Sequence, residues 1–203
     1  YKLLSQKYNL EIPNLCDDFI ISNNIRLKKN ILYLKKLTKN LKENKIKNLI
    51  LPLYGKSNMS DNNYLSFKNS LKNITKFAKN LKINILVEAN ISPQTFLNFK
   101  KHIKLNNFFF VFDTGNRINN GRNILDDLLK IFKYIKIIHL KDKNDKNKNV
   151  KFGKGNVNFK KIFKILIKKK YKNKITFESV RGVNPFTTAS YNLLYFKRLI
   201  KKL

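Results

Sequence analysis

The sequence is poor in residues that cross-link or interrupt a chain. Its 203 residues include one cysteine, no tryptophan, four prolines and six glycines. A single cysteine forms no internal disulfide, so a reducing compartment is the expectation, with Cys16 in the core. Every apolar run is shorter than the roughly 18 residues that a membrane-spanning helix needs. We therefore expect a cytoplasmic protein with no membrane partner, although a start upstream of Tyr1 would hide any targeting segment.

Acidic residues are also scarce. The chain has 12 of them against 44 lysines and arginines, which gives a formal net charge of +32. Such an excess is typical of proteins that bind nucleic acids or anionic surfaces. Here, however, the lysines are scattered over every expected helix, and Asn, Ile, Phe and Tyr are abundant with them, as A/T-rich codons produce. We favour compositional drift, do not expect nucleic acid as a partner, and expect some attraction for phosphorylated substrates.

What the sequence does contain is a regular alternation of two patterns. Short apolar runs are typical of strands that are buried on both faces of a parallel sheet. Longer segments with apolar residues every three to four positions are typical of helices that cover such a sheet. The expected strands lie at 11–16, 47–52, 83–88, 108–113, 136–141 and 174–178, and the expected helices at 30–44, 65–81, 93–103, 124–134, 158–170 and 189–203. The polar segment 142–151 is expected to be an exposed loop.

This alternation predicts an α/β fold with right-handed crossovers between parallel strands. Six units are fewer than the eight of a (β/α)8 barrel of ~250 residues. Because Tyr1–Tyr8 has the pattern of a helix end, we expect a TIM barrel that lacks its first two units. Residues 1–203 would then form a single, N-terminally incomplete domain, and its open strand edges would favour self-association. A doubly wound open sheet is the alternative.

Four of the expected strands carry, at or near their carboxyl end, a residue that can bind a metal, namely Glu88, Asp113, His139 and Glu178. Each alone fits a structural role, as a paired carboxylate, a turn cap or a core histidine. They are separated by 25, 26 and 39 residues, however, so that neighbouring strands present one ligand each at the same edge. Three carboxylates and one imidazole suit Mn²⁺, Mg²⁺, Co²⁺ or Zn²⁺.

Weaker candidates lie beyond these strand ends. Lys141 and Arg181 follow His139 and Glu178 closely and could contact an anionic substrate, although solvated charges are an equal alternative. The amides of Gly153-Lys-Gly155 could hold a phosphate, but a lone G-x-G is more often a turn. The second histidine, His102, lies in a lysine-rich helix and is expected at the surface.

At these residues the sequence resembles the sugar phosphate isomerase/epimerase family, the xylose isomerase-like TIM barrels. The matching segments follow one another along nearly the whole chain: Leu-Val-Glu88-Ala-Asn, Phe-Asp113-Thr-Gly-Asn116, Ile-His139-Leu-Lys-Asp142, Phe-Gly153-Lys-Gly155 and Thr-Phe-Glu178-Ser-Val-Arg181. The strands at 12–16 and 50–52 are similar to the family's third and fourth, and its first two have no counterpart here.

The resemblance implies one divalent metal ion held by Glu88, Asp113, His139 and Glu178. It also implies that Glu88 and Glu178 remove and return a proton on a ketose carbon, through an ene-diolate-like intermediate. Asn116, Lys141 and Arg181 are the candidate substrate contacts. The expected substrate is a sugar or sugar phosphate. An apurinic-site endonuclease of the related barrel type is an alternative, but that family needs a multi-metal cluster with many histidines. An inactive barrel remnant is a further alternative.

Overall fold

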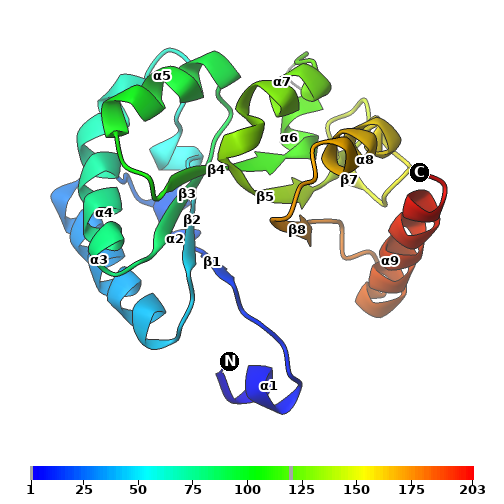
Figure 1. Cartoon of the computed structure of the whole chain (residues 1–203), viewed down its shortest axis with the longest axis horizontal. Coiled ribbons are helices and arrows are strands. Elements are labelled where there is room, and N and C mark those ends of the chain that lie inside the picture. The colour runs from blue at the N-terminus through cyan, green and yellow to red at the C-terminus, as the bar shows by residue number, and fades with distance from the viewer. Residues whose placement is uncertain (1, 119–120) are drawn as a thin grey trace. The chain divides into compact units, whose positions relative to one another are not determined.

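The computed structural model describes residues 2–118 and 121–203, so Tyr1 of the expected first helix lies outside the described residues. Six strands form one sheet in the order β1-β2-β3-β4-β5-β8 (Figure 1). Their bounds are Asn14–Cys16, Asn48–Pro52, Asn84–Glu88, Phe108–Asp113, Ile135–Leu140 and Lys174–Phe177. The strands from β1 to β4 pair in parallel with their neighbours, as β5 does with β8, which confirms the expected α/β architecture.

Helices alternate with these strands as expected. The α-helices are α1 Lys2–Lys7, α2 Phe19–Ser22, α3 Lys28–Glu43, α4 Lys68–Asn80, α5 Pro93–Ile103, α6 Thr114–Ile118, α7 Ile124–Ile131, α8 Phe159–Lys168 and α9 Pro185–Lys201. Three 3-10 turns, η1 Gly55–Ser57, η2 Tyr64–Phe67 and η3 Phe132–Tyr134, adjoin them. None of the helices in the described part of the chain is long and apolar enough to cross a membrane.

The chain forms two compact units, Tyr1–Val111 and Phe112–Leu203. That residues 1–203 form one domain stays a prediction. In the first unit, α3, α4 and α5 follow one another against the strands (Figure 1). Their buried side chains and the apolar residues of β2 and β3 form the core of this unit, which includes Leu34, Leu71, Ile74, Phe96, Phe99, Leu49, Ile85 and Val87.

The register of the first unit decides which side chains share a face. Pro52 pairs with Glu88, and Ile50 pairs with Leu86. Because alternate residues of a strand face opposite sides of a sheet, Glu88 lies on the same face as Leu86, two residues before it. Helix α5 begins as expected, with Pro93 at its first turn and the Ser92 hydroxyl accepting a hydrogen bond of 3.1 Å from the Thr95 amide.

A ladder of asparagine side chains crosses the amino ends of three strands in this unit. The Asn48 amide donates to Oδ1 of Asn14 at 2.7 Å, and the Asn84 amide donates to Oδ1 of Asn48 at 2.8 Å. Each amide thus satisfies part of its neighbour's hydrogen-bonding capacity, which a polar side chain within a sheet requires. No local pattern in the sequence indicates this ladder, because its members are more than 30 positions apart.

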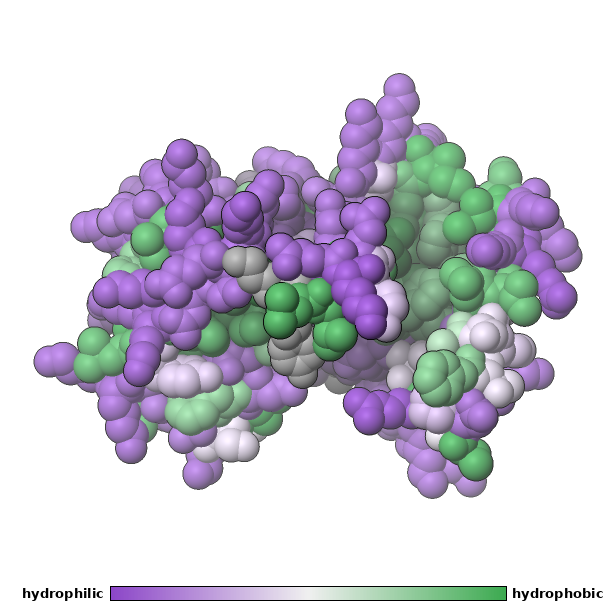
Figure 2. All heavy atoms as spheres, turned by 90° about the horizontal axis from the view of Figure 1, so that it is seen from below, coloured by the Kyte–Doolittle hydropathy of each residue, from purple (hydrophilic) through white to green (hydrophobic). Residues whose placement is uncertain are grey.

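In the second unit, aromatic side chains attach α9 to the neighbouring elements. Phe196 of α9 is buried, and its ring centroid lies 4.8 Å from that of Phe152, 5.2 Å from Phe159 and 5.0 Å from Phe177. Other apolar residues of α9 are exposed, among them Leu193 and Leu194. Figure 2 shows hydrophobic residues (green) between the long hydrophilic side chains (purple) that cover much of the viewed surface.

Four expectations about local structure need correction. Residues 114–116, which the sequence predicts as a turn after Asp113, belong to the short helix Thr114–Ile118, because Oδ1 of Asp113 accepts a hydrogen bond of 2.7 Å from the Asn116 amide. The segment expected as an exposed loop contains an antiparallel pair, β6 Asp142–Lys143 with β7 Asn149–Val150. Helix α9 begins at Pro185 instead of residue 189, because the Asn184 side chain caps it. Cys16 is exposed.

Candidate metal centre

Three predicted ligands belong to the second unit, and the strands place them at one edge. Asp113 is the last residue of β4, and His139 is the fifth residue of β5. His139 pairs with Thr176 of β8, and the amide of Glu178 donates to the carbonyl of Leu140 at 2.9 Å. This bond continues the ladder past the end of β8, so Glu178 lies on the same face of the sheet as His139.

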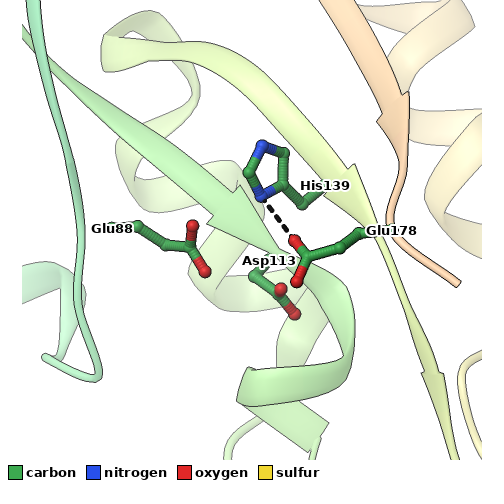
Figure 3. Close-up of side chains that lie close together, drawn as sticks. All are labelled: Glu88, Asp113, His139 and Glu178. Carbon is green, nitrogen blue, oxygen red and sulfur yellow. Dashed lines mark ion pairs between the residues drawn. The ribbon is translucent and has the colours of Figure 1, made fainter. Parts of the chain in front are cut away.

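These three side chains gather closely. Nδ1 of His139 lies 2.8 Å from Oε2 of Glu178 (Figure 3). One donor atom each of Asp113, His139 and Glu178 lies within 4.8 Å of the others. Asp113 and His139 are buried, whereas the Glu178 side chain is 44 % exposed. The group is therefore open to a small molecule on the side of Glu178.

Lys141 lies among the same side chains. Its Nζ is 2.8 Å from Oδ2 of Asp113 and 2.5 Å from Oε1 of Glu178. Burial alone would lower the pKa of Lys141, but the carboxylates of Asp113 and Glu178 outweigh it and raise that pKa above its usual range. Burial would likewise raise the pKa of Glu178, but hydrogen bonds from His139 and Lys141 lower it to about 2. Lys141 and Glu178 are therefore both charged at neutral pH.

Two residues directly after Asp113 hold Lys141 in place. The Thr114 hydroxyl donates to the carbonyl of Lys141 at 2.7 Å and accepts from its amide at 2.8 Å. A Cβ on Gly115 would lie 2.7 Å from Cγ of Lys141, so only glycine leaves room for the lysine stem. The segments Asp113-Thr-Gly and His139-Leu-Lys therefore fit together as one unit of structure.

The backbone amides of Gly153 and Gly155 donate hydrogen bonds to Asp142 and are not available to a phosphate. The amides of Gly153 and Gly155 donate to Oδ2 of Asp142 at 2.9 and 3.0 Å, and the Val157 amide donates to Oδ1 at 3.1 Å. Asp142 is fully buried, so these three bonds satisfy a carboxylate that would otherwise be costly. The suggestion that these amides hold a phosphate is therefore wrong.

The fourth predicted ligand, Glu88, belongs to the first unit. It ends β3 and is buried, and its Oε1 accepts a hydrogen bond of 3.3 Å from the Tyr54 hydroxyl. Its carbonyl accepts a bond of 2.8 Å from the amide of Leu53, just beyond the end of β2. Tyr54 was not predicted, although its place two residues after a strand end is a usable signal.

The three predicted substrate contacts differ in burial and in their contacts with the predicted ligands. Lys141 is buried beside Asp113 and Glu178. Asn116 is half-buried and bonds to Asp113 through its backbone amide. Arg181 is exposed in the segment between β8 and α9, and within the described part of the chain it makes no ion pair with the ligands. His102 is exposed on α5, as expected.

The donor set has the chemistry of a divalent-metal site. Asp113, His139 and Glu178 of the second unit each offer one ligand atom and could hold a metal ion, while Glu88 of the first unit stays a predicted fourth ligand. Three of the four residues are buried, and buried carboxylates need a cation or hydrogen-bond donors. Oxygen donors with one imidazole match Mn²⁺, Mg²⁺, Co²⁺ or Zn²⁺ rather than a thiolate-selecting ion.

Comparison with known proteins identifies the family. The model of the xylose isomerase-like TIM barrel family matches residues 2–199. The chain belongs to this family. The fold class expected from the sequence, a TIM barrel of the xylose isomerase type, is thereby confirmed, as is the resemblance on which it rested. No curated protein matches the sequence.

Several solved structures agree with this chain in fold. A xylose isomerase domain protein from Planctomyces limnophilus has a TM-score of 0.82 at 16% identity, with 99% of this chain and 82% of that one covered. An L-ribulose 3-epimerase has a TM-score of 0.82 at 13% identity, with 99% and 78% covered. A probable 3-DHS dehydratase from Bacillus anthracis has a TM-score of 0.76 at 15% identity, with 96% and 82% covered. At such identities the likeness shows the fold alone.

Proposed function

We propose that this xylose isomerase-like barrel is a divalent-metal-dependent isomerase or epimerase of a ketose sugar or sugar phosphate. The observation that carries the proposal is the gathering of Asp113, His139 and Glu178 at the carboxyl ends of their strands, where barrel enzymes place their chemistry. Several structural neighbours are sugar epimerases, including an L-ribulose 3-epimerase and a D-tagatose 3-epimerase-like protein.

Glu88, Asp113, His139 and Glu178 would hold the ion. A bound divalent cation polarises a carbonyl and stabilises the negative charge that develops on the adjacent oxygen when a carbon-bound proton leaves. With that charge stabilised, an ordinary carboxylate is strong enough to act as the base.

The two glutamates would move the proton. Glu178 is ionised and partly exposed, so its carboxylate could take a proton from the substrate carbon. Its pKa of about 2 makes it a weak base while it is paired with His139 and Lys141, so bound substrate must loosen those pairs first. Glu88, hydrogen-bonded to Tyr54, would return the proton from the other face of the carbon. Exchange of acid and base roles between two carboxylates yields isomerisation or epimerisation.

The endonuclease alternative is less well supported. Nucleases of the related type use several metal ions and many histidines. The described residues hold one group of possible ligands, and the second histidine, His102, is exposed on α5. One structural neighbour is a probable 3-DHS dehydratase, so the assay must include loss of water. Cytoplasmic location, a phosphorylated substrate and self-association stay predictions.

Metal content tests the proposal directly. We expect elemental analysis of the purified chain to find about one divalent ion per chain and a His139→Ala/Glu178→Ala variant to lose it. A His102→Ala variant removes the exposed histidine and should keep the ion. If the wild-type and His102→Ala chains hold the ion, ketoses and ketose phosphates are then screened for exchange of a carbon-bound proton with deuterated water. Absence of metal from the wild-type chain, when Mn²⁺, Co²⁺ and Zn²⁺ are supplied during purification, would leave the inactive-remnant alternative.

A further inference from the structure

The position of Lys141 carries an inference that rests on the proposed function and goes beyond it. Lysine side chains usually extend their charged end into water. Here the whole residue is buried, with 7% of its surface exposed. Thr114 holds its backbone on both sides, Gly115 leaves room for its stem, and its ammonium lies between Asp113 and Glu178. So many restraints on one lysine indicate that its charge is needed at that point.

We propose that Lys141 is a fixed counter-charge of the metal centre, which lowers the affinity for cations and favours divalent over trivalent ions. Asp113 and Glu178 bring two negative charges, and the Lys141 ammonium offsets one of them. With Glu88 included, the ligand set would carry three negative charges without the lysine and two with it. Two negative charges balance a divalent ion, whereas three would balance a trivalent ion better.

Lys141 is therefore a positioning residue rather than a substrate contact. Both of its ion pairs are made to carboxylates of the predicted ligand set, Asp113 and Glu178. Its ammonium keeps these oxygens oriented while repelling the cation that they bind. A lysine that served only to stabilise the fold would support metal binding, so its removal would weaken binding. The counter-charge predicts the opposite sign.

The test compares cation binding by the wild-type chain and by Lys141→Met, which keeps the length of the side chain and removes the charge. Mn²⁺ affinity is measured by calorimetric titration, and Tb³⁺ affinity by its luminescence. We expect Lys141→Met to bind Mn²⁺ roughly tenfold more tightly or better, because a unit charge a few ångströms from the ion is removed. The gain for Tb³⁺ should be larger than the gain for Mn²⁺. Lys141→Arg keeps the charge and should retain the wild-type preference for Mn²⁺.

Lys141→Gln provides a second neutral variant that can still donate hydrogen bonds to both carboxylates, in case Lys141→Met does not fold. Unchanged or weaker Mn²⁺ binding by a folded neutral variant, with normal binding by the wild-type chain, would overturn the counter-charge and leave the proposed function intact. An unchanged ratio of Tb³⁺ to Mn²⁺ affinity would overturn it too. If the wild-type chain and the folded variants bind no cation, the proposed function fails, and the inference fails with it.

Discussion

The amide of Gly155 donates a hydrogen bond of 3.0 Å to Oδ2 of Asp142, and a Cβ on Gly155 would collide with the other oxygen of the same carboxylate. Asp142 is fully buried and also accepts from the amides of Gly153 and Val157. The residue that follows the predicted metal-centre strand is thus fixed by the loop after β7. Because Lys141 is its neighbour, this loop also supports the centre.

This relationship predicts a large loss of stability on substitution. Gly155→Ala should lower the free energy of unfolding by about 1–3 kcal/mol, because the added methyl group has no space. Asp142→Ala should cost about 3 kcal/mol or more, because it leaves three amides without their acceptor. Urea unfolding measures both. Lys146→Ala, an exposed residue of the same hairpin, is the control and should stay within about 0.5 kcal/mol. A Gly155→Ala chain as stable as the wild type would show that Asp142 does not depend on this close approach.

The aromatic cluster of the second unit predicts which residues of α9 contribute most to the free energy of unfolding. Phe196→Ala should lower the free energy of unfolding by about 3–5 kcal/mol, because it removes a buried ring that contacts Phe152, Phe159 and Phe177. Leu194→Ala, on the exposed face of α9, should cost less than about 1 kcal/mol. Thermal unfolding of the two variants measures the difference. Equal losses would mean that both faces of the helix are covered in solution.

Asp17 predicts a dependence of stability on pH. It is buried beyond the end of β1, and desolvation raises the pKa of its carboxyl group despite hydrogen bonds from the Phe19 amide and the Tyr33 hydroxyl. A raised pKa in the folded state means that the neutral form is favoured there. The contribution of Asp17 to stability is therefore fully present at low pH and is lost as pH rises through the folded-state pKa.

Asp17→Asn should remove the decrease in stability that accompanies ionisation of the buried Asp17 carboxyl group. We expect the variant to be more stable than the wild type by roughly 1 kcal/mol at pH 7, with the difference shrinking toward pH 3. Chemical denaturation over that range measures the difference in stability between the two chains. A gain that is the same at pH 3 and pH 7 would show that the Asp17 carboxyl does not titrate differently on folding.

The hydrogen bond from Tyr54 to Glu88 predicts an indirect effect on metal binding. Groups that orient a ligand typically change metal affinity by about 10–100-fold when removed. Tyr54→Phe should therefore weaken Mn²⁺ binding about tenfold, and Glu88→Ala should weaken it more. Tyr64→Phe, whose ring packs on Phe99, is the matched control. If Tyr54→Phe binds Mn²⁺ as tightly as the wild type, the hydroxyl does not orient Glu88 for binding.

Much of the fold followed from local patterns in the sequence. The strand at Phe108–Asp113 and the helix at Pro93–Ile103 have the expected bounds, because an apolar run and a Ser-Pro helix start are strong local signals. The hairpin of β6 and β7 was missed, because its polar residues resemble a loop and its pairing depends on Asp142. Cys16 was placed in the core because small apolar residues usually lie there, but it belongs to the short strand β1 and is exposed.

The sequence by itself determined which residues end the strands, since a carboxylate or histidine directly after an apolar run marks the point where a buried strand meets polar surroundings. It could not determine what surrounds them. That Thr114 and Gly115 hold Lys141, and that Lys141 lies between Asp113 and Glu178, depends on contacts between residues that are more than 20 positions apart. Such contacts are set by strand register and packing, which no local pattern encodes. Only the tertiary structure showed that Lys141, a candidate substrate contact, pairs with two of the predicted ligands.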